Sequence, residues 1–292
     1  MSSTDPADLV IHLPLSRARR AARPLVDDPA AAAAAAAALA AGALVGHPSG
    51  PVYALTARPD APTARALNRL TGRPPREPGS VTTTPLRLPA LLDWSRLPAP
   101  LAAAPVLGLL DALLGLGPVG VRGPAAPGVP DHLTRVDAGV RTLLVVMPGP
   151  GCPSADFLAR ALRAAGTDLL ATAIAGRCRA LPAPVDEPAH WRAAGLRADF
   201  GTDPRFRLLE HRDDEVARLR HPAHAPVAPT VLALHTVLPA GPGGRRRLLL
   251  ERHGSLPADE VRALVDGFGF DLAVGPLARH RLPRRDYAAV GA

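Results

Sequence analysis

The sequence predicts an α/β fold, and three features of the 292-residue chain support that prediction. Its 35 prolines and 26 glycines are spread along the whole length, which suits many short elements joined by tight loops better than a helical bundle. Residues 141–174 read as a buried strand, an amphipathic helix and a second strand. Residues 229–254 contain two apolar, strand-like runs separated by Gly-Pro-Gly-Gly, which is typical of a β-hairpin.

An alanine-rich helix is predicted over residues 28–41. Asp27 or Asp28 is its expected N-cap, Pro29 lies in the first turn and Gly42 is the expected C-cap. The alanine-rich run is nearly long enough for a membrane span, but alanine contributes little transfer energy and two aspartates precede it directly. We therefore expect no membrane segment. Beyond this helix the pattern predicts strand, turn and strand over 43–55, a helix over 62–71 and a β-branched strand over 80–84.

The second half of the chain continues the alternation of strands and helices. The helix over 154–166 has Ser154 as its expected N-cap and Gly166 as its expected C-cap. Because parallel strands need a crossover connection, we expect the strands on either side of this helix to pair in parallel. The other expected elements are proline-broken helices over 89–97 and 106–116, strands over 118–123 and 206–211, an irregular segment over 177–206 and a capped helix over 256–269.

Charge and cysteine content limit the classes of function. The formal charge is +8, and all 34 basic side chains are arginines. A positive surface attracts nucleotides, tRNA and other polyanions, although charge alone identifies no ligand. The two cysteines, Cys152 and Cys178, form no CxxC pair, which excludes a zinc ribbon, and they make no disulfide framework. A reducing, cytoplasmic location is the simplest expectation.

Several widespread catalytic motifs are absent from the sequence. There is no GxxxxGK phosphate loop, no GxGxxG that follows a strand and opens a helix, no HExxH and no GxSxG. His211, His221 and His224 lie in an arginine-rich stretch without the spacing of a helical metal pair, so we expect a solvated loop and assign no metal site. No catalytic residue is assigned. The residues by themselves predict a basic α/β protein.

Residues 30–80 read in order as a helix, a strand led by glycine, a turn, a second helix and a strand. This order resembles the opening of the YrdC domain, which is found in threonylcarbamoyl-AMP synthases. The segment HPSGPVYAL is similar to that family's P-T-x-T-x-Y-G-L turn, and the segment LTGRPP is similar to its K-x-R-P motif. Thr71 stands where the family has lysine, while Arg73 and Pro74 match. In the first motif the matching residues are Pro48, Ser49 (for threonine), Val52, Tyr53 and Leu55, and the departures are Gly50, Pro51 and Ala54.

Weaker similarities extend the resemblance to residue 268. Ala173 and Ala175 fall where the family has its S-x-N pair, and Val146 stands where it has an arginine. The segment APTVLAL is similar to the family's P-S-T-V segment, with Pro229 in place of the serine. The retained residues in these later segments are Gly117, Pro118, Thr230, Val231, Arg252 and Gly254.

The resemblance implies a twisted, open mixed sheet flanked by helices, in a single domain over 28–268. A partly disordered leader over 1–27 and a basic tail over 269–292 are expected on either side. The implied activity is that of a nucleotidyltransferase, which joins L-threonine, bicarbonate and ATP into threonylcarbamoyl-AMP with release of pyrophosphate, for modification of tRNA. ATP is then a substrate accompanied by Mg²⁺, and tRNA or double-stranded RNA is the implied macromolecular partner.

The resemblance also implies the residues of the site. Arg73 is the best phosphate-binding candidate, because a guanidinium group offers a bidentate fork. The hydroxyl of Ser49 is expected to bind threonine or phosphate, and Tyr53 to pack against the ligand or to fill the core. Thr230 and Arg252 are expected nucleotide contacts. Asn68 and Arg69, which lie within a turn before Thr71, are the candidates to replace the missing lysine.

The substitutions leave three functions open. The first is an active synthase with a rearranged site. The second is a catalytically degenerate relative that binds a nucleotide or RNA without turnover. The third is a carbamoyl-transfer enzyme with a different acceptor. At a phosphate site, one lost charge-assisted contact of about 1.5–3 kcal/mol slows a reaction about tenfold to a hundredfold if it falls on the transition state.

Overall fold

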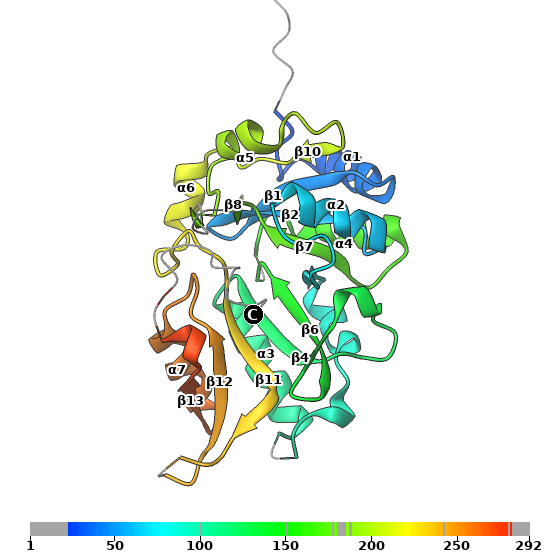
Figure 1. The fold of residues 1–292 in the computed structure, drawn as a ribbon. Coiled ribbons are helices and arrows are strands. Elements are labelled where there is room, and N and C mark those ends of the chain that lie inside the picture. The colour runs from blue at the N-terminus through cyan, green and yellow to red at the C-terminus, as the bar shows by residue number, and fades with distance from the viewer. Residues whose placement is uncertain are drawn as a thin grey trace, which may run out of the picture.

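The computed structural model describes residues 23–99, 101–149, 151–176, 178–179, 185–186, 189–241, 243–279 and 281. Within them, an 11-stranded mixed sheet runs through the molecule in the order β10-β1-β2-β7-β3-β6-β4-β11-β12-β13, with β5 paired to β6. Helices flank this sheet (Figure 1). Together with the comparisons given below, this architecture confirms the predicted α/β class.

The helices and strands are short, as the proline and glycine content predicts. The helices are α1 (Pro29–Ala40), α2 (Ala61–Leu70), α3 (Ala103–Gly115), α4 (Ala155–Ala165), α5 (Ala193–Phe200), α6 (Asp214–Leu219) and α7 (Ala258–Gly267). The strands are β1 (Leu44–Ser49), β2 (Val52–Ala57), β3 (Ser80–Thr82), β4 (Val119–Pro124), β5 (Arg135–Asp137), β6 (Val140–Met147), β7 (Leu170–Ile174), β8 (Cys178–Arg179), β9 (Val185–Asp186), β10 (Phe206–Leu208), β11 (Thr230–Leu238), β12 (Arg246–Arg252) and β13 (Phe270–Val274). The short 3₁₀ helices are η1 (Pro85–Leu91), η2 (Trp94–Arg96), η3 (Asp131–Leu133) and η4 (Pro276–Ala278).

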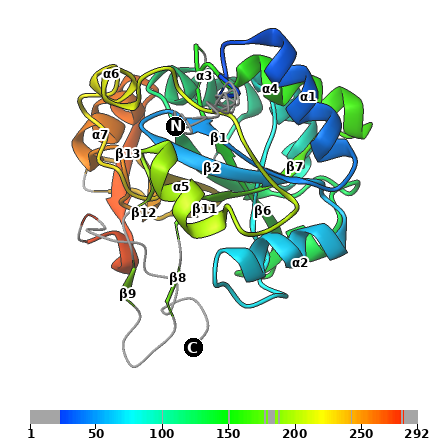
Figure 2. The ribbon, with the colours of Figure 1, turned by 90° about the horizontal axis from the view of Figure 1, so that it is seen from above.

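One half of the sheet is covered by α1 and α4. Alanines of α1 pack against Phe157 and Leu162 of α4, and both helices meet Val45 of β1 and Leu170 of β7. Seen from above, α1 and α4 lie together beside β1 (Figure 2). The small alanine side chains let these two helices approach closely, so the alanine-rich run is a packed helix of the protein core.

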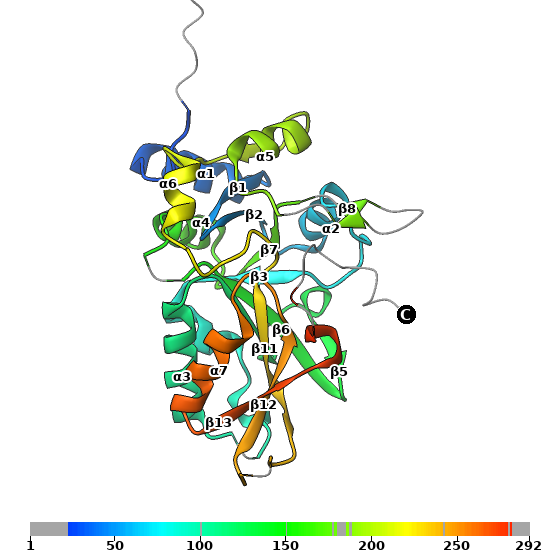
Figure 3. The ribbon, with the colours of Figure 1, turned by 90° about the vertical axis from the view of Figure 1, so that its left-hand side faces the viewer.

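The other half of the sheet has helices on one face. In β4, β6, β11 and β12 every second side chain points into the main core with α3 and α7, as the period of two in a strand requires. Figure 3 shows α3 and α7 together on one side of these strands. The core-facing residues are Val119, Val121, Leu143, Val145, Met147, Leu232, Leu234, Leu248 and Leu250. The intervening residues point to the opposite face, where the candidate site lies.

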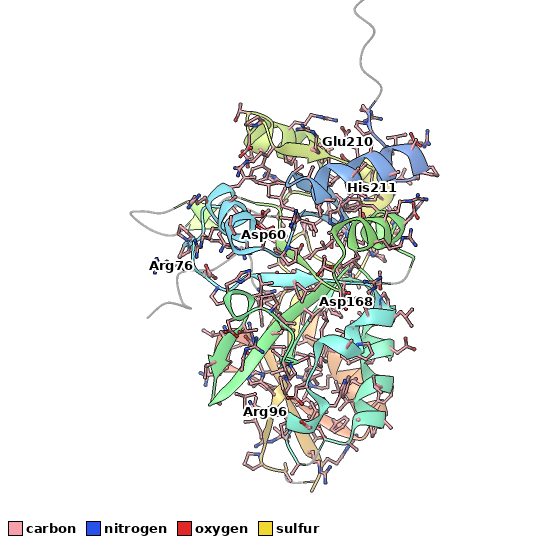
Figure 4. The ribbon with its side chains drawn as sticks, turned by 90° about the vertical axis from the view of Figure 1, so that its right-hand side faces the viewer. Asp60, Arg76, Arg96, Asp168, Glu210 and His211 are labelled. Atoms are coloured by element: carbon pink, nitrogen blue, oxygen red, sulfur yellow. The ribbon has the colours of Figure 1, made fainter. Side chains whose placement is uncertain are left out.

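A segment before α1 extends the sheet at its β10 edge. Leu25 bridges to Glu210 in parallel, and the amide of Val26 donates to the Glu210 carbonyl at 2.9 Å. The buried Glu210 carboxylate forms ion pairs with Arg23 and Arg197. Figure 4 shows Glu210 beside α1. Residues 24–26 are therefore paired with the edge of the sheet directly before α1 begins.

Most of the predicted elements and two of the predicted helix ends are confirmed. Asp28 is the N-cap of α1 and accepts from the amide of Ala30, and Gly166 ends α4 in the left-handed region. The predicted hairpin is formed by β11 and β12. Ser154 occupies the N-cap position of α4, but its hydroxyl donates to the Pro48 carbonyl instead of capping the helix.

The predicted parallel pairing around α4 is wrong. β3 lies between β6 and β7; it pairs in parallel with β6 and antiparallel with β7. The helix between β6 and β7 is α4, which packs on α1 over the other half of the sheet. The chain therefore passes β3, which comes earlier in the sequence, before it forms β7. Sequence order predicts neighbouring strands often but not always, and here the earlier β3 takes the middle position.

Other differences concern the irregular segments. Residues 89–97, predicted as a helix, form parts of 3₁₀ turns around Pro89, and the segment predicted as irregular contains α5. The sheet continues past residue 268, because β13 pairs in parallel with β12. The expectations for residues 1–22 and 282–292 fall outside the described residues. None of the described helices has the length and apolarity needed to cross a membrane.

His47 gives a testable pH dependence of stability. Its Nδ1 donates to the Pro48 carbonyl at 3.0 Å, so Nε2 accepts from the Thr56 hydroxyl at 2.7 Å and the ring is neutral. Burial lowers the pKa of His47 from 6.5 to about 4. The unfolded chain therefore binds the extra proton first, and stability contributed above pH 6.5 is lost as the pH falls toward 4, by up to about 3 kcal/mol.

We expect urea denaturation to show this loss between about pH 7 and about pH 4.5. In the His47→Gln variant, the free energy of unfolding should fall less steeply with decreasing pH, because only the contribution of His47 is removed and that of the other histidines remains. Equal slopes in the two proteins would show that His47 does not carry the effect.

Candidate functional site

A cleft of about 700 Å³ opens on the face of the sheet opposite α3 and α7. Its floor comes from β6, β7, β11 and β12, and its sides come from the loop after α2, from β5 and from η4. A volume of this size is in the usual range for small-molecule sites. The aliphatic floor residues are Leu144, Val146, Ile174, Val231 and Leu249.

Charged side chains from distant parts of the chain meet in this cleft. Four arginines and three carboxylates line it, so positive charge is in slight excess. They come from the loop after α2, from β4, from β5 and from β12. The arginines are Arg73, Arg122, Arg135 and Arg252, and the carboxylates are Glu77, Asp137 and Glu251.

Glu251 links two of the arginines. The Nε of Arg122 donates to both Glu251 oxygens at 2.9 and 2.8 Å, and Arg135 donates to one of them at 2.9 Å. Arg135 also donates to Asp137 at 2.9 Å, and His235 lies 3.2 Å from the same Asp137 carboxylate. The charges of Arg122 and Arg135 are therefore largely balanced within the protein.

Arg252 has a different environment. Its Nε donates to the Pro229 carbonyl at 2.8 Å, and its terminal nitrogens have no hydrogen-bond partner within the described residues. Burial lowers the pKa of Arg252 to about 10; Glu251 opposes this effect, and the nearby cations Arg122 and Arg73 add to it. The guanidinium group stays charged at neutral pH. Its unused donors make Arg252 better suited to bind an anion than Arg122 and Arg135, which are paired with carboxylates.

Arg73 is placed in the cleft by the loop after α2. The amide of Arg73 donates to the Asn68 carbonyl, and the Asn68 side chain donates to the carbonyls of Pro75 (3.3 Å) and Glu77 (2.8 Å). Asn68 thus orders the loop that carries Arg73, and it does not replace a lysine. The Glu77 carboxylate of this loop makes no ion pair within the described residues.

The predicted site residues divide into two groups. Arg73 and Arg252 line the cleft, whereas Ser49, Tyr53, Arg69 and Thr230 do not. Ser49 is buried at the end of β1, and Arg69 is exposed on α2. Neither residue is close enough to the cleft to line it, so the ligand contacts expected of them find no support in the geometry.

Tyr53 is a buried residue whose hydroxyl links separate elements of the fold. It is 1% exposed, its hydroxyl donates to Asp214 at 2.6 Å, and the same oxygen accepts from the His211 amide at 3.0 Å. Asp214 also accepts from the amide of Ala193. The pKa of Tyr53 is raised above its ordinary value, mainly by burial and to a smaller extent by the hydrogen bond to Asp214. Tyr53 therefore joins β2 to the starts of α5 and α6, in line with the expectation that it fills the core.

Thr230 is also a structural residue. Its hydroxyl donates to the Leu256 carbonyl at 2.6 Å and accepts from the amides of Gly254 and Leu256 at 3.0 and 3.1 Å. A β-carbon on Gly254 would lie 2.1 Å from the Ala228 carbonyl oxygen, so only glycine lets the chain pass there. These contacts place the segment after β12 and leave the Thr230 hydroxyl no capacity for a nucleotide.

The positions that depart from the YrdC motifs are also clear in the structure. Thr71 is completely buried and donates back to the Leu67 carbonyl at 3.0 Å, so it offers nothing to the cleft. Ala173 and Ala175 lie in the main core. Val146 does line the cleft, as an apolar residue. His224, expected in a solvated loop, is buried, and its Nε2 donates to the Leu116 carbonyl at 2.8 Å.

Sequence reasoning missed Arg122, Arg135, Asp137 and Glu251. A signal for two of them was present, because Arg122 and Glu251 interrupt apolar strand-like runs. A charged residue inside such a run points to a partner on the same sheet face, but the partner's identity depends on which strands are neighbours.

A smaller cavity of about 170 Å³ adjoins the cleft. Both are lined by Glu77, Gly79 and Ser80, and the smaller one extends under α2 to His132. Arg76, which also lines it, points outward from the loop after α2 (Figure 4). Metal ligands are scarce nearby, since the described residues contain no group of three or more His, Cys, Asp or Glu side chains able to hold a metal ion.

Comparison with solved structures identifies the fold. Sua5 from P. abyssi in complex with L-threonine is similar with a TM-score of 0.59 and 19% sequence identity, over 85% of this chain and 60% of that one. A doubly substituted form of the same protein gives 0.60 and 18%, over 85% and 63%. A hypothetical protein from Streptococcus mutans gives 0.54 and 12%, over 82% and 94%.

Sua5 is a YrdC-like protein, so the chain has a YrdC-like fold, and the predicted fold is confirmed. The chain spans about three fifths of the length of the Sua5 structures. No protein-family model matches the sequence, and no curated protein matches it.

Thr230 gives a prediction that separates structural from ligand-binding roles. We expect Thr230→Val to lower the free energy of unfolding by about 3 kcal/mol, because it leaves buried backbone groups without their partner. The measurement is urea denaturation. The matched control is Thr236→Val in the same strand, whose hydroxyl makes no hydrogen bond within the described residues. Similar stability in both variants would contradict the structural role.

Glu251 gives a second prediction. We expect Glu251→Gln to destabilise the protein by about 3 kcal/mol, because Arg122, only 7% exposed, loses its carboxylate partner. Added inorganic pyrophosphate should recover part of that loss by supplying an anion. The control is Glu215→Gln, which removes an exposed ion pair with Arg192 and should change stability by less than about 1 kcal/mol. Equal effects of the two substitutions would show that Glu251 does not balance the cleft.

Proposed function

We propose that this protein binds a nucleotide phosphate in the cleft, without the turnover of a threonylcarbamoyl-AMP synthase. The observation that carries the proposal is the meeting of Arg73 and Arg252, close to Arg122, in one cleft. Like charges gathered in a partly buried site repel one another, and a bound polyanion relieves that repulsion. The donors of Arg252 that are unused within the described residues suit phosphate oxygens.

The proposed absence of turnover rests on what surrounds these arginines. The reaction needs cations over the triphosphate to stabilise the leaving pyrophosphate. Thr71 is buried, Val146 is apolar, and Arg122 and Arg135 are neutralised by carboxylates. Each missing contact of this kind slows a reaction about tenfold to a hundredfold when it acts on the transition state.

The second candidate function is the synthase reaction itself. It is favoured by the fold shared with Sua5, which has been observed in complex with L-threonine, and by the presence of Arg73 in the cleft. In that reading ATP, L-threonine and bicarbonate are substrates, and tRNA, or double-stranded RNA, is the partner. A carbamoyl-transfer enzyme with another acceptor has no specific support in the geometry.

Binding is tested by calorimetric titration of ATP with Mg²⁺. We expect Arg73→Ala and Arg252→Ala each to weaken affinity about tenfold to a hundredfold, because each removes a charged contact to phosphate. Arg69→Ala is the matched control, since Arg69 is exposed and does not line the cleft. Affinity that is unchanged in the two cleft variants would contradict the proposed site.

Turnover is tested in the same preparations by pyrophosphate release with ATP, Mg²⁺ and bicarbonate, with and without L-threonine. We expect no threonine-dependent release, with an active Sua5 as the positive control. Release that depends on threonine and disappears in Arg73→Ala would establish the synthase reading in place of binding alone.

A further inference from the structure

The floor of the cleft is an apolar row that ends at a cation. Val146 on β6 pairs with Gly120 on β4, Gly120 pairs with Val231 on β11, and Val231 pairs with Arg252 on β12. Paired residues of neighbouring strands point to the same face of a sheet. The register of β11 and β12 shifts directly after Val231, and Arg252 lines the same cleft as Val231. The order across four strands is therefore aliphatic, glycine, aliphatic, guanidinium.

Gly120 makes this row continuous. A β-carbon at this position would lie 2.8 Å from Cγ2 of Val231 and 3.4 Å from Cδ1 of Leu144. Aliphatic side chains of both neighbouring strands therefore lie close to the glycine, where a larger residue would push them apart. Leu144 and Leu249 line the cleft in the next row along the strands, in which Arg122 is the β4 residue.

The mouth of the cleft carries further apolar groups. Val136 of β5 and Leu277 of η4 both line it, and they are 74% and 59% exposed. They are among the large hydrophobic side chains that the described surface leaves exposed, and two such residues around one cleft indicate a surface that meets an apolar group. On the same sheet face, Arg122 of β4 pairs in register with Leu144 of β6 and is ion-paired with Glu251 of β12, so this ion pair lies beside the apolar row of Val146, Gly120 and Val231.

We infer that the natural ligand is an amphipathic anion, a nucleotide whose phosphate carries an apolar acyl or alkyl substituent. The phosphate lies against Arg252 and Arg73, and the substituent lies along Val146 and Val231. A small polar substituent would leave this floor in contact with water, whereas an aliphatic one removes apolar surface of both partners from water. This inference rests on the proposed nucleotide binding and specifies the class of ligand for the same cleft.

The experiment is a calorimetric titration with AMP and with its 5′-phosphate methyl and butyl esters. We expect the butyl ester to bind at least about tenfold more tightly than the methyl ester, since each buried methylene group contributes about threefold to fourfold. The ratio of the two affinities should fall in Val146→Thr, which places a hydroxyl on the floor. It should be unchanged in Val216→Thr, since Val216 is exposed on α6 and does not line the cleft.

The outcomes separate this inference from the proposed function. Equal affinities for the methyl and butyl esters, with AMP bound, would overturn the apolar ligand and leave nucleotide binding in place. No binding of AMP or of either ester would overturn both. Titration of the unsubstituted protein with AMP and the two esters decides between these outcomes, even if the Val146→Thr variant is unstable.

Discussion

A strand presents its side chains to two faces in turn, and in β4, β6, β11 and β12 helices cover only one of them. The core residues of these strands meet α3 and α7, and the intervening residues form the floor of the cleft. The position of the cleft, its aliphatic floor and the strands that carry Arg122 and Arg252 all follow from this one constraint. A shift of register by one residue in β12 would move Glu251 into the core and remove the partner of Arg122.

The electrostatic character of the cleft depends more on which arginines are paired with carboxylates than on its net charge. Four arginines face three carboxylates, so the excess of positive charge is small. Glu251 and Asp137 hold Arg122 and Arg135 in place, and Arg252 is oriented by a backbone carbonyl that leaves its terminal nitrogens available. Glu251 and Asp137 thus balance the charges of Arg122 and Arg135, while the terminal nitrogens of Arg252, which have no partner within the described residues, suit an external anion.

The sequence predicted the fold class and most of the elements, because these depend on local patterns, and the resemblance to the YrdC motifs indicated two residues that line the cleft, Arg73 and Arg252. Arg73 follows a helix end, and Arg252 ends a strand of a clear hairpin. Thr230 was expected to contact a nucleotide, and Tyr53 to contact the ligand or to fill the core. Both hydroxyls are hydrogen-bonded within the protein, because a hydroxyl that suits a ligand equally suits a backbone amide or a carboxylate. Only the fold shows that Leu256 and Asp214 lie within reach. The insertion of β3 between β6 and β7 was likewise not readable, since it depends on packing between distant segments.

The segment before α1 has a consequence for how molecules of this protein meet one another. Leu25 and Val26 occupy hydrogen-bonding groups at the β10 edge of the sheet, and Glu210 is enclosed there by two arginines. Backbone groups that are already paired at Glu210 are not available to a strand from another molecule. Within the described residues, the opposite edge is β13, beside which Arg245 pairs with Asp266 and Asp271. Charged side chains at an open edge oppose its pairing with a strand of another molecule, so both ends of this large sheet carry features that disfavour edge-to-edge association.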